Sequence, residues 1–599
     1  MIYHCEDHTC NYWDEGEKLP ERCPQCGRKL LRANEADMTG DDWTALGNTL
    51  WDAEASDKKR MVDCFRKAAY LGSAWGVCNL GICMEQGNGV EADPVQAFWL
   101  YQQAVEMGSL NAVCCLGVCY QYGIGTAPDA EKAAELYCKA AEYGSPRGQM
   151  LLARAFHDGI GVEADAAEAV HWVRAAAYQR YGEGMYRLGV CYAYGDGVEQ
   201  NWERAVHWFR EAAESGVSAA MTDLGYCYEK GCGVEQSWEQ AFSWYRRGAE
   251  CGYPVSMSNL GLCYKRGYGV DQNWQEAIKW YEQGAQCGDL QSMHNLACCY
   301  ERGEGVEQNE DRALYWYRRS AEGGNGDAMC NLGRCYERGY GVEQNWQEAV
   351  KWYEQGAQCG NLQSMHNLAC CYEHGEGVEQ NMTEAIRWYT AAAEGGNADA
   401  MHNLGWLYDH GEGVEQDMKK AICWYERAAE QNHPAAMNSL GECYAMGRGV
   451  PRDLETAMEW YRRAAELGEA MADYNMGWHL EQAGKLSEAY AHYRKAADGN
   501  DDSAWWALGR FYENGVVVAQ DGKEARRCYE TGEKLGSVKC KMRLARCKLL
   551  GIGGRREKKA GLDLCRQALE LAKESSEKED YGYEAEMNLL RRTIAENES

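Results

Sequence analysis

Four cysteines near the start of the chain have the type and spacing of a metal site. Cys5 and Cys10 lie in YHCEDHTC and Cys23 and Cys26 in LPERCPQCG, so the pattern is C-x4-C, twelve residues, then C-x2-C. Two tight turns that each offer two thiolates suit tetrahedral zinc, and a closed four-ligand site is structural rather than catalytic. The sequence therefore predicts one structural zinc ion held by these four cysteines.

Residues 1–36 are too few to build a hydrophobic core without a metal or a similar constraint, which favours zinc over four free thiols in an unfolded tail. With its paired cysteines on two turns, the segment resembles a small zinc ribbon. His8 leaves one alternative open, because a C-x2-H pair would let it replace Cys10 as a ligand.

Several histidines recur at fixed intervals. His294, His366 and His402 share one position of a repeat, and His374 and His410 share another. Zinc–nitrogen bonds are about 2.1 Å long, whereas equivalent residues of stacked helix pairs lie about 10 Å apart. One ion cannot span that gap, so these histidines are predicted to be surface residues.

No other pattern in the sequence predicts catalysis. The stretches GYGV and GEGV lack the spacing and the lysine of phosphate-binding loops. No Ser-His-Asp or Cys-His arrangement stands out from the repeat. We therefore expect a protein that is not an enzyme.

Charge and hydropathy narrow the choice of partners and compartment. The formal net charge is −30, which repels phosphate backbones and argues against a nucleic-acid partner. No apolar run approaches the about 20 residues of a membrane span, and the first residues lack the features of a signal peptide. We expect a cytoplasmic protein with no membrane partner.

Many of the 30 cysteines occupy one position of the repeat, about a helix pair apart, which is too far for disulfide bonds between them. We expect small buried apolar side chains in a reducing compartment rather than a disulfide framework. They are Cys83, Cys119, Cys191, Cys227, Cys263, Cys299, Cys335, Cys371, Cys443 and Cys547.

A Leu-Gly dipeptide, or a close variant, recurs every 36 residues and sets the register of the repeat. Its first residues are Leu80, Leu116, Leu152, Leu188, Leu224, Leu260, Leu296, Leu332, Leu368, Leu404, Leu440 and Met476. Leu46, Leu508 and Leu544 extend the series at slightly different intervals, which gives about fifteen units.

The unit around Leu404 shows helical spacing in two segments. Apolar residues of the first are Ala400, Met401, Leu404, Gly405 and Tyr408, and those of the second are Ala421, Trp424, Tyr425, Ala428 and Ala429. Gly411 and Gly413 are predicted to end the first helix, and Asp417 to cap the second. Equivalents of Asp417 are Asn201, Asn273, Asn309, Asn345 and Asn381. Recurring tryptophans are predicted to fill the space between the helices.

The combination of Leu-Gly, Tyr, Gly-x-Gly-Val, Ala and Trp-Tyr in AMHNLGWLYDHGEGVEQDMKKAICWYERAAEQ resembles the SEL-one-like repeat (SLR), a subclass of the tetratricopeptide family. The predicted fold is all-α, a right-handed α-α superhelical solenoid of about fifteen helix pairs preceded by the zinc ribbon. The predicted domains are residues 1–36 (ribbon), 41–550 (repeat solenoid) and 551–599 (C-terminal capping helices).

The resemblance implies that the first helix of each pair lines the concave face, with positions −2, +2, +5 and +6 from the register residue pointing inward. The early units supply apolar and aromatic residues there, and the middle units supply charged ones. The candidate partner-binding residues are Tyr186, Tyr194, Tyr226, Lys265, Arg266, His294, Arg302, Arg334, Arg338, His366, His402, Trp406 and His410.

Aromatic and arginine residues are common anchors of protein interfaces. We therefore predict a non-catalytic scaffold or adaptor that binds a partner protein, as an extended peptide or a helix, along the concave face. The alternative is a regulatory or sensor subunit that recognises a ligand or nucleic acid through the zinc ribbon.

Overall fold

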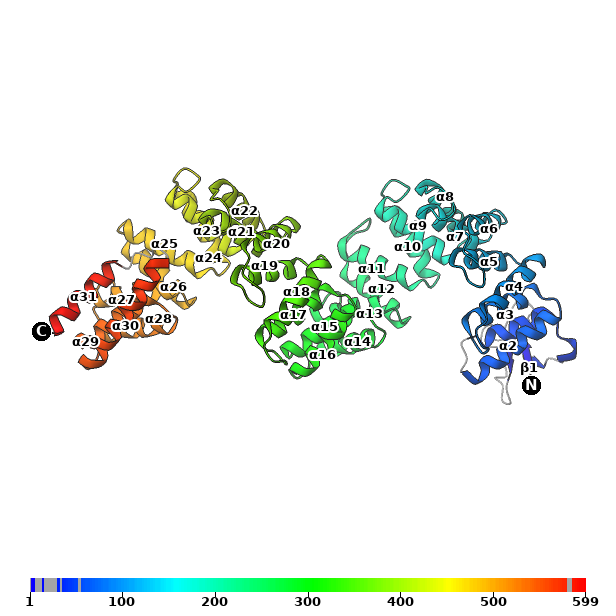
Figure 1. Cartoon of the computed structure of the whole chain (residues 1–599), viewed down its shortest axis with the longest axis horizontal. Coiled ribbons are helices and arrows are strands. Elements are labelled where there is room, and N and C mark those ends of the chain that lie inside the picture. Colours follow the sequence, from blue (N-terminus) through cyan, green and yellow to red (C-terminus); the bar gives the residue numbers. More distant parts are fainter. Residues whose placement is uncertain are drawn as a thin grey trace. The chain divides into compact units, whose positions relative to one another are not determined.

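The computed structural model describes residues 2–5, 13–15, 30–32, 35–51, 55–578 and 584–598 (Figure 1). The chain forms two compact units, Met1–Gln308 and Asn309–Ser599. Both are stacks of antiparallel helix pairs, so the predicted α-helical repeat solenoid is confirmed.

A small antiparallel sheet precedes the helices. Its strands are β1 (Ile2–Cys5), β2 (Trp13–Glu15) and β3 (Leu30–Arg32), in the order β2-β1-β3, and the 3-10 helix η1 (Glu35–Asp37) follows. Cys10, Cys23, Cys26 and the side chain of Cys5 lie outside the described part of the chain, and so does the alternative ligand His8. The zinc site therefore stays a prediction from the sequence.

In unit 1, odd-numbered helices are the first helices of the pairs and even-numbered helices are the second. They are α1 (Gly40–Thr49), α2 (Ala55–Tyr70), α3 (Ala74–Gln86), α4 (Pro94–Glu106), α5 (Leu110–Tyr122), α6 (Ala130–Glu142), α7 (Pro146–Asp158), α8 (Ala166–Tyr178), α9 (Gly182–Tyr194), α10 (Trp202–Glu214), α11 (Ser218–Lys230), α12 (Trp238–Glu250), α13 (Pro254–Arg266), α14 (Trp274–Gln286) and α15 (Leu290–Arg302).

Unit 2 continues the same alternation up to its last helix. Its helices are α16 (Glu310–Glu322), α17 (Gly326–Arg338), α18 (Trp346–Gln358), α19 (Leu362–His374), α20 (Met382–Gly395), α21 (Ala398–His410), α22 (Met418–Glu430), α23 (Pro434–Met446), α24 (Leu454–Glu466), α25 (Ala470–Gln482), α26 (Leu486–Asp498), α27 (Asp502–Asn514), α28 (Gly522–Lys534), α29 (Val538–Leu550), α30 (Lys558–Lys578) and α31 (Glu584–Glu598).

The predicted helix ends are confirmed in the unit around Leu404. Gly411 ends α21 with φ 74°, and Gly413 follows with φ 70°, a backbone region that favours glycine. Asp417 begins α22, and its carboxylate accepts hydrogen bonds from two backbone amides of the first turn. The five asparagines predicted from the pattern cap their helices in the same way.

The predicted role of the tryptophans is confirmed only in part: Trp424 packs against the core, but the tyrosine that follows it fills the space beside the register glycine. Tyr425 is 1% exposed, whereas Trp424 is half-buried. The Arg427 guanidinium lies over the Trp424 ring, 4.3 Å from its centroid. A Cβ added to Gly405 would lie 2.7 Å from the Tyr425 ring. Consecutive helical residues point about 100° apart, so only one of the two rings can face the glycine.

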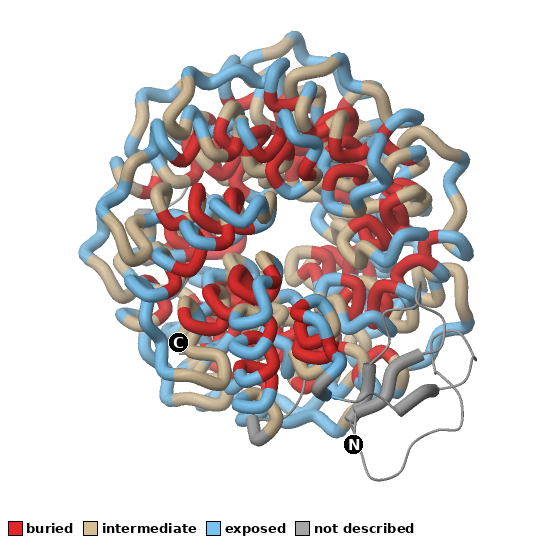
Figure 2. Tube along the Cα trace, turned by 90° about the vertical axis from the view of Figure 1, so that its right-hand side faces the viewer, coloured by how far each residue is buried: buried red, intermediate tan, exposed pale blue. Residues whose placement is uncertain are grey.

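A tyrosine at the equivalent position is fully buried in most repeats of both units. These rings belong to Tyr101, Tyr137, Tyr245, Tyr281, Tyr317, Tyr353, Tyr389, Tyr425, Tyr461, Tyr493 and Tyr529. Figure 2 shows how buried and exposed stretches alternate along the helices. The recurring cysteines are also buried, as predicted, and every described cysteine is a free thiol.

Several successive first helices lie against one another in both units. In unit 1, α3 contacts α5 and α5 contacts α7, and in unit 2, α17 contacts α19. Successive second helices of the described chain touch less extensively. Each stack therefore bends with the first helices on its inner side, because elements inside a curve lie closer together.

The last helix covers the end of unit 2. Helix α31 packs on α29 and α30. The Arg543 guanidinium of α29 donates two hydrogen bonds of 2.7 Å to the Glu586 carboxylate of α31, and both side chains are largely buried. This ion pair fixes α31 against the final helix pair.

Candidate protein-binding surface

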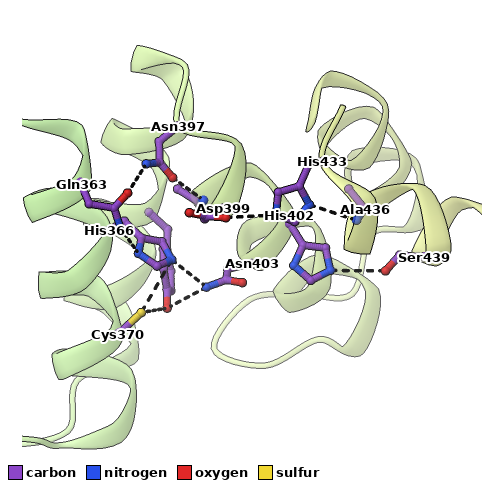
Figure 3. Close-up of polar contacts among 12 residues, drawn as sticks. Gln363, His366, Cys370, Asn397, Asp399, His402, Asn403, His433, Ala436 and Ser439 are labelled. Carbon is purple, nitrogen blue, oxygen red and sulfur yellow. Dashed lines mark hydrogen bonds and ion pairs between the residues drawn. The ribbon is translucent and has the colours of Figure 1, made fainter. Parts of the chain in front are cut away.

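Residues two positions before the register residue link one first helix to the next. In unit 2, His366 Nε2 lies 3.2 Å from Nδ2 of Asn403 in the following repeat (Figure 3). One repeat later, His402 Nε2 lies 3.4 Å from Ser439 Oγ. In unit 1, Tyr186 likewise bonds to the Asp223 carboxylate, whose pKa is raised by burial. Position −2 therefore holds adjacent repeats together.

This linkage corrects one prediction about the histidines. His374 and His410 are exposed, as predicted, but His294, His366 and His402 are half-buried. The −2 side chains among the candidate partner-binding residues are thus already engaged inside the stack. They contribute to the inner face mainly by fixing the spacing of the helices that form it.

His402 lies in a compact polar cluster with His433 and Asp399 (Figure 3). The two imidazole rings stack with centroids 5.2 Å apart, and His433 Nε2 lies 3.1 Å from Asp399 Oδ1. His433 Nδ1 also accepts a hydrogen bond from the Ala436 backbone amide at the start of α23. Burial, assisted by the neighbouring His433, lowers the pKa of His402 to about 4, so His402 is neutral at neutral pH.

Residues at position +5 are held by contacts within the stack. The buried tyrosine hydroxyl of a repeat donates to the glutamate at +5, as from Tyr245 to Glu229 at 2.8 Å and from Tyr389 to Glu373 at 2.6 Å. Lys265 occupies the same position and pairs with Glu304 of the next repeat at 3.2 Å, with its side chain only 14% exposed. Position +5 therefore stabilises the stack of helix pairs, which we call the frame.

Positions +2 and +6 carry the side chains that face solvent. In unit 1, Tyr194 is 77% exposed and Tyr226 is 45% exposed. The predicted residues Arg266, Arg302, Arg338 and His410 are also exposed at +6. At +2 in unit 2, Arg334 and Trp406 are half-buried, and the Trp406 ring stacks on His410 with centroids 4.2 Å apart. These two positions form the accessible part of the inner face.

One stretch of this surface is absent from the sequence-based candidates. A cavity of about 480 Å³ in unit 2 is lined by Tyr474, Trp478 and Met446, with Arg448 and Glu442 beside them. Arg448 pairs with the buried Asp409 at 3.0 Å, and burial raises the pKa of Glu442. Trp478, Met446 and Tyr474 occupy positions +2, +6 and −2, so extending the same register past His410 finds them.

The described residues hold no group of three or more His, Cys, Asp or Glu side chains arranged to bind a metal ion.

No helix in the described part of the chain is long and apolar enough to cross a membrane.

A sequence profile described as Sel1 repeat matches fourteen segments of the chain. The matched residues are 76–109, 112–145, nine consecutive 36-residue segments that run from 146–181 to 434–469, and then 470–501, 504–537 and 538–573. The last match includes most of α30, so the repeated sequence runs beyond residue 550.

The chain is also similar to proteins of known structure. A protective antigen of uropathogenic Escherichia coli strains that displays an SLR fold is 32% identical, over 75% of this chain and 97% of that chain, with a TM-score of 0.51. A Sel1 repeat protein from Oxalobacter formigenes is 33% identical, over 41% of this chain and 96% of that chain, with a TM-score of 0.37. No curated protein matched the chain.

The profile matches cover well over half of the sequence, and the helix pairs, glycine-ended first helices and capped second helices recur in the matched segments. The chain therefore belongs to the Sel1 repeat family.

Proposed function

We propose that the protein is a non-catalytic scaffold or adaptor that binds a segment of a partner protein along the first helices of its repeats. Sel1 repeat proteins generally act as protein-interaction scaffolds. The observation that carries the proposal is the contrast between register positions. Positions −2 and +5 are engaged in contacts inside the stack, while +2 and +6 expose side chains that change from repeat to repeat.

The exposed side chains suit protein recognition. In unit 1, Tyr194, Tyr226 and the 38%-exposed Leu262 offer aromatic and apolar contacts. In unit 2, Arg338 and His410 offer hydrogen-bond donors at the equivalent positions of its own first helices. Tyrosine and arginine are enriched among the residues that dominate binding energies at interfaces. A face made of consecutive parallel helices fits an extended peptide or a helix as its occupant.

Matched variants test the proposal. A partner captured by the full chain should bind at least tenfold more weakly when Tyr194→Ser and Tyr226→Ser are combined. The control is Tyr178→Ser, because Tyr178 is 70% exposed but lies on a second helix. A further variant adds to the double variant the replacement of every other exposed +2 and +6 residue of unit 1. If this variant binds the partner as tightly as wild type does, the proposal is contradicted.

We also propose that Cys5, Cys10, Cys23 and Cys26 hold one structural zinc ion. The support is their spacing in the sequence. Elemental analysis of the purified full chain should find about one equivalent of zinc, and Cys23→Ser should lose it. A separate His8→Ala variant that keeps its zinc would exclude His8 as a ligand.

A further inference from the structure

In the repeats with register residues from Leu80 to Leu440, except that of Leu152, a buried ring comes from the residue 21 positions after the register leucine. In the repeat that begins at Leu116, this residue is Tyr137, and a Cβ added to Gly117 would lie 2.5 Å from its ring. In the repeat that begins at Leu188, Phe209 packs on Gly189 in the same way, with a corresponding distance of 2.6 Å. The ring and the glycine together close the space between the paired helices.

The repeat between these two lacks both parts of that contact. Twenty-one residues after Leu152 the chain has Val173, and the register glycine is replaced by Ala153. Val173 is 6% exposed, compared with 1% for Tyr137. His157 stands where other repeats have the glutamate or glutamine that accepts the tyrosine hydroxyl. The space that a ring fills elsewhere is therefore open here.

A cavity of about 380 Å³ occupies this position between α7, α8 and α9 of unit 1. Ala153, Val170 and Val173 contribute apolar side chains to its wall, together with Met150 and Val190. An apolar cavity of about 150 Å³ is enough to bind benzene. The cavity is thus large enough for the side chain of phenylalanine or tyrosine.

Three arginines surround this apolar wall in a chain whose net charge is −30. Arg154 is already engaged, since it donates to the Tyr122 hydroxyl and lies 3.7 Å from the Asp158 carboxylate. Arg147 lies against Cys115, with Nη1 3.7 Å from the sulfur. Arg187 forms no ion pair with a described residue. Arg147 and Arg187 therefore keep positive charge available to a ligand.

Two carboxylates near the cavity lie against His157. His157 contacts Asp158 at 2.7 Å and Asp196 at 3.3 Å, and the bond to Asp158 raises the pKa of His157. Glu183 is the remaining carboxylate of the wall. With Arg147, Arg154 and Arg187 on the wall against Glu183 and Asp196, the cavity favours an anionic group over a cationic one.

We propose that this cavity binds an aromatic side chain with a neighbouring carboxylate, carried by an extended segment of a partner protein. The ring takes the place that Tyr137 and Phe209 occupy in the adjacent repeats. The carboxylate accepts hydrogen bonds from Arg147 and Arg187, which present guanidinium groups suited to it. This inference rests on the proposed function, because it names one anchor of the partner segment.

Three blocked peptides test the chemistry on the full chain by isothermal titration. The probe is acetyl-Gly-Phe-Asp-Gly-amide, and the controls replace its aspartate with lysine or its phenylalanine with alanine. The probe should bind at least tenfold more tightly than either control. A wild-type chain that does not prefer the probe to the lysine control overturns the proposal, and so does one that does not prefer it to the alanine control.

The decisive variant restores the ring of the neighbouring repeats. Ala153→Gly combined with Val173→Tyr recreates the Gly117–Tyr137 pair and should lower affinity for the probe at least tenfold while preserving the melting temperature. Arg187→Gln, a change at an exposed side chain, should lower it about fivefold without touching the apolar wall. Unchanged affinity in a correctly folded double variant, or in Arg187→Gln, overturns the proposal.

The outcome is separable from that of the proposed function. If the double variant loses the probe and still captures the partner through Tyr194 and Tyr226, the scaffold function stands and the cavity is no anchor for that partner, which overturns the proposal. Loss of both probe and partner supports it, provided that Tyr178→Ser retains both.

Discussion

The repeats with register residues Leu116 and Leu152 share their length, their glycine-ended first helix and their aspartate-capped second helix. They differ in what fills the space between the two helices. In the first, Tyr137 packs on Gly117, and in the second, Val173 and Ala153 leave a cavity. The comparison teaches that residues kept from repeat to repeat build a frame, and that departures from them create places where a partner can bind.

The largest expected effect comes from removing a frame ring. Tyr137→Ala should destabilise the chain by about 3–5 kcal/mol, because it opens a cavity in a fully packed site. Val173→Ala should cost only about 1–2 kcal/mol, since Val173 already borders open space. Hydrogen exchange of α5 to α8 in the full chain would measure both, as repeats can open separately. Equal costs would break the comparison.

A second test separates frame from surface within one helix. Burial lowers the pKa of His402 to about 4, whereas an unfolded histidine titrates near 6.5. Between these values only the unfolded chain takes up the proton, so the free energy of unfolding should fall as the pH falls from 6.5 to 4, by up to about 3 kcal/mol. The bond from His433 lowers the pKa of Asp399, so Asp399 loses its contribution only at still lower pH.

His402→Gln should flatten this pH dependence in urea titrations followed by circular dichroism. His410→Gln is the matched control, because His410 lies two turns further along α21 and is exposed. An unchanged slope in His402→Gln would show that the burial of His402 is not what makes the stability depend on pH.

Exchanging the small residues sharpens the first comparison. Gly117→Ala places a Cβ 2.5 Å from the Tyr137 ring, so it should destabilise by about 1–3 kcal/mol even though alanine favours helices. Ala153→Gly should cost about 1 kcal/mol, the usual penalty of glycine inside a helix, because no ring packs there. Melting temperatures of the two variants would show whether the tyrosine ring is the reason for glycine at the register position.

The frame was largely predictable from the sequence, because its residues repeat. The helix caps at Asp417 and its equivalents, the glycines at 411 and 413 and the buried cysteines follow from spacing and residue type. The choice of Tyr425 over Trp424 as the buried ring did not follow, since both are large and adjacent. It depends on which ring points at Gly405, and that is set by the angle at which the two helices cross.

The candidate surface was predicted less completely, because a register position does not state which neighbour it meets. His366 and His402 share their position with Tyr186, and all three reach the next repeat rather than solvent. The cavity at Val173 has a signal in the sequence, namely the interruption of a series of aromatic residues. Only the structure shows that no other described residue fills the space.

The smallest expected effect on stability belongs to the exposed positions, where binding and folding should separate. Tyr194→Ser in unit 1 and Arg338→Ser in unit 2 should each change the free energy of unfolding by less than about 0.5 kcal/mol, because both side chains face solvent. Partner affinity should fall in each, and only the loss caused by Arg338→Ser should shrink at high salt, since salt screens charge but not apolar contact. Arg387→Ser, at a 60%-exposed side chain on the second helix α20, serves as the charge control. Arg338→Ser could cost as much stability as Gly117→Ala, or Arg387→Ser could weaken partner binding as much as Arg338→Ser does. Either result would show that the residues that stabilise the repeats and the residues that bind the partner are not separate sets.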